Sequence, residues 1–148
     1  MRWVEANEDM AFDVGFALRE QDREEVKLSH GLDGLEAVLD SYLYSDICRG
    51  IEGDDGTVVG LTGLCGDRIW LLGTEGLTAT KSHRWQLCAH GREWVEYCLR
   101  HVGAPIGNYV YAKNLRSIKW LRSLGFTVLP PAPLGPGCSL FCEFWRTV

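Results

Sequence analysis

Residues 110–126 read VYAKNLRSIKWLRSLGF and predict a strand, a turn, a helix and a second strand. Aromatic and β-branched side chains dominate residues 108–111, and the side chain of Asn114 is suited to capping a following helix. Apolar residues then recur at the spacing of one helix face: Leu115, Ile118, Leu121 and Leu124. Gly125 stands where a glycine ends a helix, so Phe126 begins the next strand.

The other face of this helix and the turn before it carry basic residues at every third position: Lys113, Arg116, Lys119 and Arg122. Such a stripe is typical of a solvated surface. It is also suited to binding phosphate or an acidic partner. The sequence leaves both interpretations open.

Length and composition favour a single α/β domain over residues 1–148, because a chain of 148 residues with 46% hydrophobic content forms one core. No apolar run approaches the roughly 20 residues of a membrane span. The acidic start MRWVEANED does not resemble a signal peptide. We therefore expect a cytoplasmic protein that does not bind membranes.

Six cysteines are scattered along the chain without a C-x-x-C pair: Cys48, Cys65, Cys88, Cys98, Cys138 and Cys142. We expect free, buried thiols in a reducing compartment and no metal site. Charge is distributed unevenly. Residues 1–80 contain six basic and 17 acidic residues, whereas residues 81–122 contain eight basic and two acidic residues. An anion site is therefore expected in the C-terminal half.

The expected order is a strand, two helices, three antiparallel strands, a helix, a strand, a helix and two strands. Strands are predicted over 2–6, 47–52, 57–64, 68–72, 108–111, 126–128 and 139–146. The first helix begins after the capping residue Asn7, and the run REQDREEVK is expected to solvate its far end. A second helix covers 32–42. The longest has an apolar face from Trp85 to Val102.

Within the sheet, Gly60 and Gly63 indicate a bulge or a close backbone approach. Residues 129–138, which read LPPAPLGPGC, hold four of the five prolines. We expect this segment to be either an exposed contact surface or a loop that crosses the sheet.

The pattern V-x-x-x-N-x-x-S-I-x-x-L-x-x-L-G-F over residues 110–126 resembles the C-terminal motif of the GCN5-related N-acetyltransferase (GNAT) fold. The order of elements is similar to that fold over the whole chain, which implies a mixed, mostly antiparallel central sheet flanked by helices. The run from GLCGDRIWLL to NYVYAKNLRSIKWLRSLGF most resembles small GNAT-like proteins of short-tailed lytic phages, which are associated with virion morphogenesis.

The resemblance implies an acetyl-CoA site between the fourth and fifth strands. It places the cofactor against residues of the fourth strand, the start of the long helix and the start of the following helix: Leu71, Leu72, Thr80, Lys81, Ser82, His83, Arg84, Asn114 and Ser117. The family's pyrophosphate loop, [QR]-x-x-G-x-[GA], is missing, because the nearest glycines, Gly73 and Gly76, come too early. Side chains at the loop would approach the phosphate where glycine leaves room.

Many members of the family have a tyrosine seven residues after the asparagine that protonates the leaving thiolate. Here that position is Leu121. Glu75, Tyr109 and Tyr111 are the candidates for catalytic base or acid. Each also has an ordinary interpretation: a solvated carboxylate for Glu75, and packing within the sheet for the two tyrosines.

Two functions follow from the resemblance. The first is transfer of an acetyl group from acetyl-CoA to an amine of unknown identity. The second is a non-catalytic GNAT-fold phage protein that binds a phage or host protein in virion assembly or host takeover. Nucleic-acid binding is disfavoured, because the sequence pI is near 5.3 and only one helix is basic.

Overall fold

The computed structural model describes all 148 residues, which form eight strands and five α-helices. The strands are β1 (Arg2–Glu5), β2 (Ile47–Glu52), β3 (Val58–Cys65), β4 (Arg68–Gly73), β5 (Ile106–Tyr111), β6 (Thr127–Val128), β7 (Ala132–Leu134) and β8 (Ser139–Arg146). The helices are α1 (Glu8–Phe16), α2 (Glu20–His30), α3 (Gly34–Tyr44), α4 (Lys81–Val102) and α5 (Leu115–Ser123). A short 3₁₀ helix, η1 (Glu75–Leu77), precedes α4.

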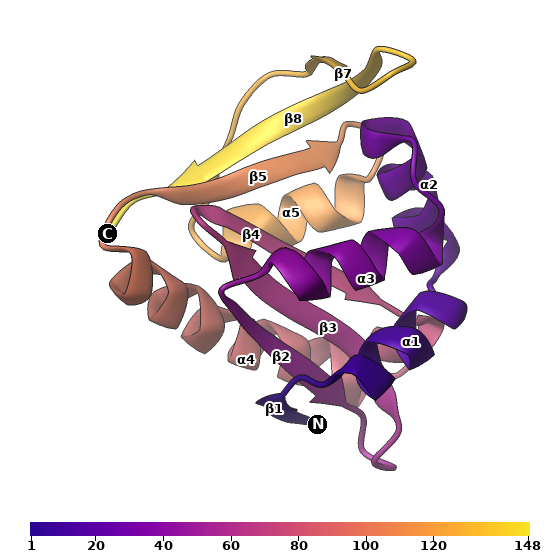
Figure 1. Cartoon of the computed structure of the whole chain (residues 1–148). Helices are drawn as coiled ribbons and strands as arrows, with labels where there is room; N and C mark the ends of the chain where they lie inside the picture. Colours follow the sequence, from indigo (N-terminus) through magenta and orange to yellow (C-terminus); the bar gives the residue numbers. More distant parts are fainter.

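The strands form one sheet in the order β1-β2-β3-β4-β5-β8-β6, and β7 pairs with the outer part of β8. Every pair is antiparallel except β4 with β5, which is parallel and contains a single residue pair, Arg68 with Gly107. Figure 1 shows β5 and β8 diverging from β4 beyond this point. The predicted mixed, mostly antiparallel sheet is confirmed, and its one parallel pair is the place where the sheet opens.

Helices cover both faces of the sheet. Figure 1 shows α1 and α3 in front of it and α4 behind it. Ala11 and Val14 of α1 and Val38 of α3 are buried with Leu61 of β3. The larger core joins α4 and α5 to β3, β4, β5 and β8, and it includes Trp94, Val95, Leu99, Ile106, Val110, Ile118, Leu121, Leu124 and Phe144.

Residues 110–126 form the end of β5 and the predicted helix α5, and the second strand, β6, follows. The Asn114 side chain caps α5 by accepting from the Ser117 N–H at 3.3 Å, and Gly125 has a φ of +91° just beyond the helix. Ile118, Leu121 and Leu124 are buried as expected, but Leu115 is 73% exposed. It is the first residue of α5, and its side chain lies outside the core cluster. The basic stripe is exposed at all four positions.

Three helices, not two, separate the first two strands. Residues 17–19 interrupt the expected first helix, because Leu18 forms a β-bridge with Thr74. The charged run that follows is therefore a separate helix, α2, and it is not simply solvated, since Asp22 is buried. Trp85 was expected on the buried face of α4 and is 73% exposed, because it lies two residues from the buried His83 and Leu87 and so on the opposite side of the helix.

The smaller predictions have mixed outcomes. The predicted bulge is confirmed beside Gly60, where the register between β2 and β3 shifts at Ile51 and Glu52. At Gly63 a Cβ would lie 2.6 Å from the ring of Trp70, which is a side chain and not the backbone. All six cysteines are free, but Cys65 and Cys138 are exposed, contrary to the expectation of buried thiols. The proline-rich segment contributes β7 to the edge of the sheet. No helix has both the length and the apolar character needed to cross a membrane.

Candidate functional site

A cleft of about 790 Å³ opens where β4 and β5 diverge. Of the residues that the sequence predicted for a site, five line this cleft: Leu71, Leu72, Arg84, Tyr109 and Ser117. The others lie outside it: Glu75, Thr80, Lys81, Ser82, His83, Tyr111 and Asn114. The cleft is thus lined by predicted residues from β4, α4, β5 and α5. Most of the residues predicted at the start of α4 lie outside its lining.

The edge of β4 that faces the cleft has one open backbone position. Strand alternation directs the backbone groups of even-numbered residues towards β3, as the Thr74 N–H to Val59 O bond of 2.9 Å shows. The groups of residues 69, 71 and 73 therefore face β5. The carbonyl of Ile69 accepts from the Asn108 side chain at 2.9 Å. Leu71 keeps both its N–H and its C=O directed into the cleft.

Gly73, the last residue on that edge, is bonded to the segment that joins α1 to α2. Its N–H donates to Asp22 Oδ2 at 2.9 Å, and its carbonyl accepts from the Arg19 N–H at 2.9 Å. The Arg19 guanidinium also pairs with Asp22 Oδ2 at 2.8 Å, and both side chains are at most about a tenth exposed. Burial raises the pKa of Asp22, although the Arg19 charge opposes the shift. This arrangement closes one end of the cleft.

Glu25 lies one turn after Asp22 on α2, beside the end of β5. Its Oε1 accepts from the Tyr111 N–H at 3.2 Å and from the Asn114 side chain at 3.0 Å. Burial raises the pKa of Glu25 to about 7, against the lowering effect of the Asn114 hydrogen bond. A carboxylate with a pKa near neutrality in a cleft is able to accept and return a proton at physiological pH.

Sequence reasoning missed Glu25 and Asp22, which it took for part of a solvated run. A signal was present in that run. Helix α2 has only two apolar residues, Val26 and Leu28, so it lacks the apolar stripe by which a helix usually packs. A helix of this kind that is nonetheless held in a fold must make polar contacts, and Arg19, Asp22 and Glu25 recur at three-residue spacing.

The start of α4, where the sequence predicted the pyrophosphate site, is largely bonded to its own chain. Thr80 Oγ1 accepts from the His83 N–H at 3.0 Å and so caps the helix. The His83 ring donates from Nδ1 to the Gly76 carbonyl at 2.7 Å, and its Nε2 accepts from the Asp54 N–H at 3.0 Å. Its role is therefore to fix the loop. The Ser82 hydroxyl donates to the Asp54 carboxylate at 3.2 Å.

Two basic side chains remain near the helix start without a carboxylate partner. Lys81 is exposed, and Arg84 is exposed at the mouth of the cleft and donates to the Thr78 carbonyl at 3.0 Å. Together with the N-terminus of α4, they are able to attract an anion. The Asp54 carboxylate beside the first turn weakens this attraction, although the N-terminal ammonium of Met1, which pairs with it at 2.6 Å, offsets part of its charge.

The predicted catalytic residues differ in their placement. Tyr109 lines the cleft, and its ring contacts the guanidinium of Arg68 at 5.2 Å from the ring centroid. The Tyr111 ring packs against Phe141, at 5.3 Å between centroids, and lies outside the cleft. Glu75 is exposed on η1, also outside the lining. Tyr109 is thus the one predicted catalytic side chain that reaches the cleft.

Comparison with known proteins rests on structure alone. No protein-family model and no curated protein sequence matches the chain. Among solved structures, a ribosomal-protein-alanine N-acetyltransferase from Brucella melitensis superposes with a TM-score of 0.70 at 16% identity, covering 100% of both chains. The chain has the GNAT fold.

Two further solved structures support the same fold. A GCN5-related N-acetyltransferase from Kribbella flavida superposes with a TM-score of 0.67 at 17% identity, over 99% of this chain and 97% of that one. A spermidine N-acetyltransferase from Vibrio cholerae, in complex with CoA and spermine, gives 0.64 at 9% identity, over 98% and 94%. Each superposition covers nearly all of both chains, which agrees with the GNAT-like order of elements expected over the whole sequence.

Proposed function

We propose that the chain is an acetyl-CoA-dependent N-acyltransferase that modifies an amine and works in the cytoplasm. The observation that carries the proposal is the open N–H and C=O pair of Leu71 inside the cleft. An extended ligand with amide groups is able to pair with such an edge as an added strand does. The cleft volume of about 790 Å³ is in the range of small-molecule sites.

The residues around the cleft fit the arm of the cofactor better than its diphosphate. Leu71 and Leu72 provide the edge and an apolar wall, and Ser117 lines the cleft from α5. Arg84 and Lys81, with the first N–H groups of α4, are the groups that would hold the diphosphate. When bound, acetyl-CoA supplies the acetyl thioester that the amine attacks.

In this proposal Glu25 is the general base, in place of Glu75. Its Oε1 is fixed by two hydrogen bonds, while Oε2 has no partner within the chain and is free to take a proton from an ammonium group. The carboxylates of Asp22 and Glu25 also favour a positively charged acceptor near α2. Tyr109 of β5 lines the same cleft, and it is the proton donor in this proposal.

Isothermal titration with acetyl-CoA tests the cofactor site. We expect micromolar binding to the wild type and a loss of about tenfold or more in Arg84→Glu, because charge reversal opposes the diphosphate. Arg122→Glu, on the exposed far end of α5, is the matched control and should bind as the wild type does. Absence of binding at millimolar acetyl-CoA would refute the proposal.

A second candidate is a non-catalytic protein that acts by binding a phage or host protein in virion assembly or host takeover. The specific observation in its favour is the bonding of Gly73 to Asp22 and Arg19, which removes one residue of the β4 edge from any ligand. The Asp54 carboxylate beside α4 and the leucine at position 121 point the same way. A negative titration with acetyl-CoA supports this candidate.

A further inference from the structure

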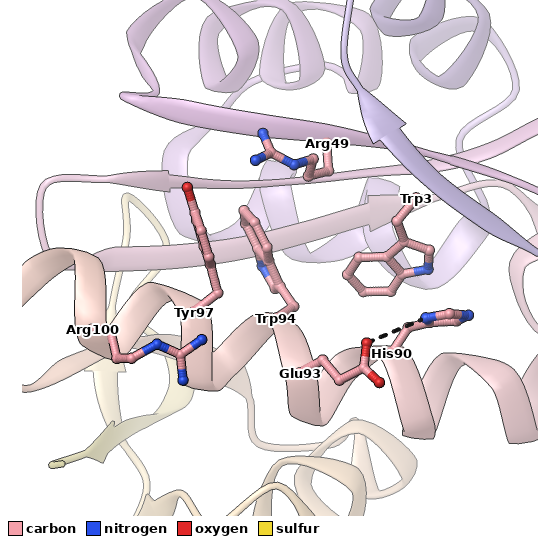
Figure 2. Close-up of a pocket in the computed structure, with 7 residues that line it drawn as sticks. All are labelled: Trp3, Arg49, His90, Glu93, Trp94, Tyr97 and Arg100. Carbon is pink, nitrogen blue, oxygen red and sulfur yellow. Dashed lines mark ion pairs between the residues drawn. The ribbon is translucent and has the colours of Figure 1, made fainter.

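A second hollow of about 290 Å³ lies between β1, β2 and α4. Its lining residues are Trp3, Arg49, His90, Glu93, Trp94, Tyr97 and Arg100, and we refer to it as the surface pocket. Figure 2 shows Tyr97 and Trp94 as parallel plates on α4, with Arg49 above them and Trp3 beside Trp94. Only Trp3 and Trp94 also border the cleft.

Arg49 is the central cation of the surface pocket, and no carboxylate of the chain pairs with it. Its guanidinium lies 5.6 Å from the Trp94 ring centroid and 5.7 Å from that of Tyr97. The side chain is half-buried, and its one hydrogen bond is a long contact of 3.3 Å to the neighbouring Cys48 carbonyl. In the same half of the chain, which has 17 acidic residues, Arg2, Arg19 and Arg68 pair with carboxylates. Arg49, like Arg23 and Lys27, does not.

The surface pocket as a whole has donors in surplus. Arg100, on the same rim, also forms no ion pair within the chain. The indole Nε1 groups of Trp3 and Trp94 are buried without an acceptor. The single carboxylate of the lining, Glu93, faces His90 at 3.9 Å. A ligand that satisfies this environment must bring acceptors and negative charge.

We propose that the surface pocket binds a carboxylate side chain from an acidic peptide segment of a partner protein, with Arg49 as the anchor and Arg100 as a second contact. Trp, Tyr and Arg are the residues that most often dominate the energy of protein interfaces. The aromatic rings hold the guanidinium in place, so little side-chain freedom is lost on binding. This proposal is independent of the acetyltransferase proposal, because Arg49 and Arg100 lie outside the cleft.

Nucleic acid fits the surface pocket less well than a peptide does. Single strands are bound by stacking bases on exposed aromatic faces. Here Trp94 is only 7% exposed, with Tyr97 stacked against it at 5.7 Å and Arg49 above it. A hollow of about 290 Å³ also suits one or two side chains better than a nucleotide.

Isothermal titration of the whole chain with a capped octapeptide of alternating Glu and Leu tests the proposal, with the Gln and Leu peptide as the uncharged control. We expect the acidic peptide to bind about tenfold tighter than its control, more weakly at high salt. Arg49→Gln should lose about tenfold and Arg100→Gln about threefold. Arg122→Gln, an exposed arginine on α5, should behave as the wild type.

Equal affinity for the two peptides, no binding at millimolar peptide, or unchanged binding in Arg49→Gln would overturn the proposal. So would tighter binding of an oligothymidylate than of the acidic peptide, which would assign the surface pocket to nucleic acid. If Arg49→Gln does not fold, Arg100→Glu replaces it, because that side chain is exposed, and retention of full affinity in this variant refutes the proposal.

Discussion

The cleft and the surface pocket differ in their charged groups, although Trp3 and Trp94 border both. Carboxylates of Asp22 and Glu25 line the cleft beside α2 and Arg84 lines it beside α4, whereas the unpaired guanidinium groups of Arg49 and Arg100 border the surface pocket. In our proposals the cleft takes both an amine and the anionic cofactor, and the surface pocket takes an anion alone. The acidic half of the chain contributes to both, because it contains the two carboxylates and Arg49 as well.

The difference shows that local packing, and not the charge of a chain segment, determines where charge is available for binding. The charge asymmetry of the sequence placed the anion site in residues 81–122. Of the two arginines of the surface pocket, only Arg100 comes from that segment. Arg49 belongs to the acidic half, and its guanidinium lies against the rings of Trp94 and Tyr97 without an ion pair within the chain.

The largest effect is expected where the cleft begins. At Gly107 a Cβ would lie 2.0 Å from the Phe144 carbonyl oxygen, a contact that only a backbone shift can relieve. Gly107→Ala should lower the free energy of unfolding by about 3 kcal/mol or more, measured by chemical denaturation. Gly137→Ala is the control, because no atom lies within 4 Å of its Cβ position. Equal stability of the two variants would show that β5 and β8 do not pair closely here.

A somewhat smaller loss is expected at the closed end of the cleft. Asp22→Ala leaves the buried Arg19 charge unpaired and removes the acceptor of the Gly73 N–H. The cost should be about 3 kcal/mol in the free energy of unfolding. Glu52→Ala breaks a pair with Arg2, whose side chain is 77% exposed, and should cost less than about 1 kcal/mol. Similar losses in both variants would contradict the buried role of Asp22.

The sequence predicted the framework of the fold well because its signals are local. Asn114 and Gly125 mark the ends of α5, and apolar residues at helical or alternating spacing mark the elements between. The split of the first helix was missed because it depends on the bridge between Leu18 and Thr74, residues far apart in the sequence. No window of a single sequence contains such a contact.

The candidate site was predicted less completely, for the same physical reason. Tyr109, Arg84 and Leu71, which the sequence predicted for a site, line the cleft, since strand ends and helix starts meet there. Glu25 was missed because its environment is made by Tyr111 and Asn114, which approach it only in the folded chain. His83 was expected to hold phosphate, and its ring nitrogens are already bonded to the loop.

The buried carboxylate of Glu25 gives the stability of the protein a dependence on pH. Its folded pKa of about 7 lies above the ordinary glutamate value of 4.5. The stability it contributes is therefore full below about pH 4.5 and is lost as the pH rises through about 7. Glu25→Gln should remove this loss, so that between pH 5 and pH 8 the variant gains on the order of 2 kcal/mol over the wild type.

Denaturation at several pH values measures this difference. Glu24→Gln, an exposed neighbour on the same helix, is the control and should follow the wild type. If the gap between Glu25→Gln and the wild type does not widen with pH, the carboxylate is solvated, and its proposed role as a base fails with it. In an acetyl-transfer assay Glu25→Gln should lose about 100-fold in turnover.

The smallest effect concerns the start of α4, where Lys81 and Arg84 lie near the mouth of the cleft. Thr80 supplies the cap, and its backbone is extended, with φ of −117° and ψ of 157°, so glycine fits there without strain. Thr80→Gly should cost a few tenths of a kcal/mol, because glycine is itself an acceptable cap residue. Removing the side chain also frees the His83 N–H and the space beside it, so acetyl-CoA should bind several-fold tighter.

Thr80→Ser is the matched variant, because it keeps the capping hydroxyl and should keep the wild-type affinity. Tighter binding by Thr80→Gly alone would mean that the threonine side chain limits the cofactor site, and that the site differs from a glycine loop by one removable obstacle. Unchanged affinity in both variants would assign the limit to the Asp54 carboxylate beside the same turn, and Asp54→Asn would then be the substitution that raises affinity.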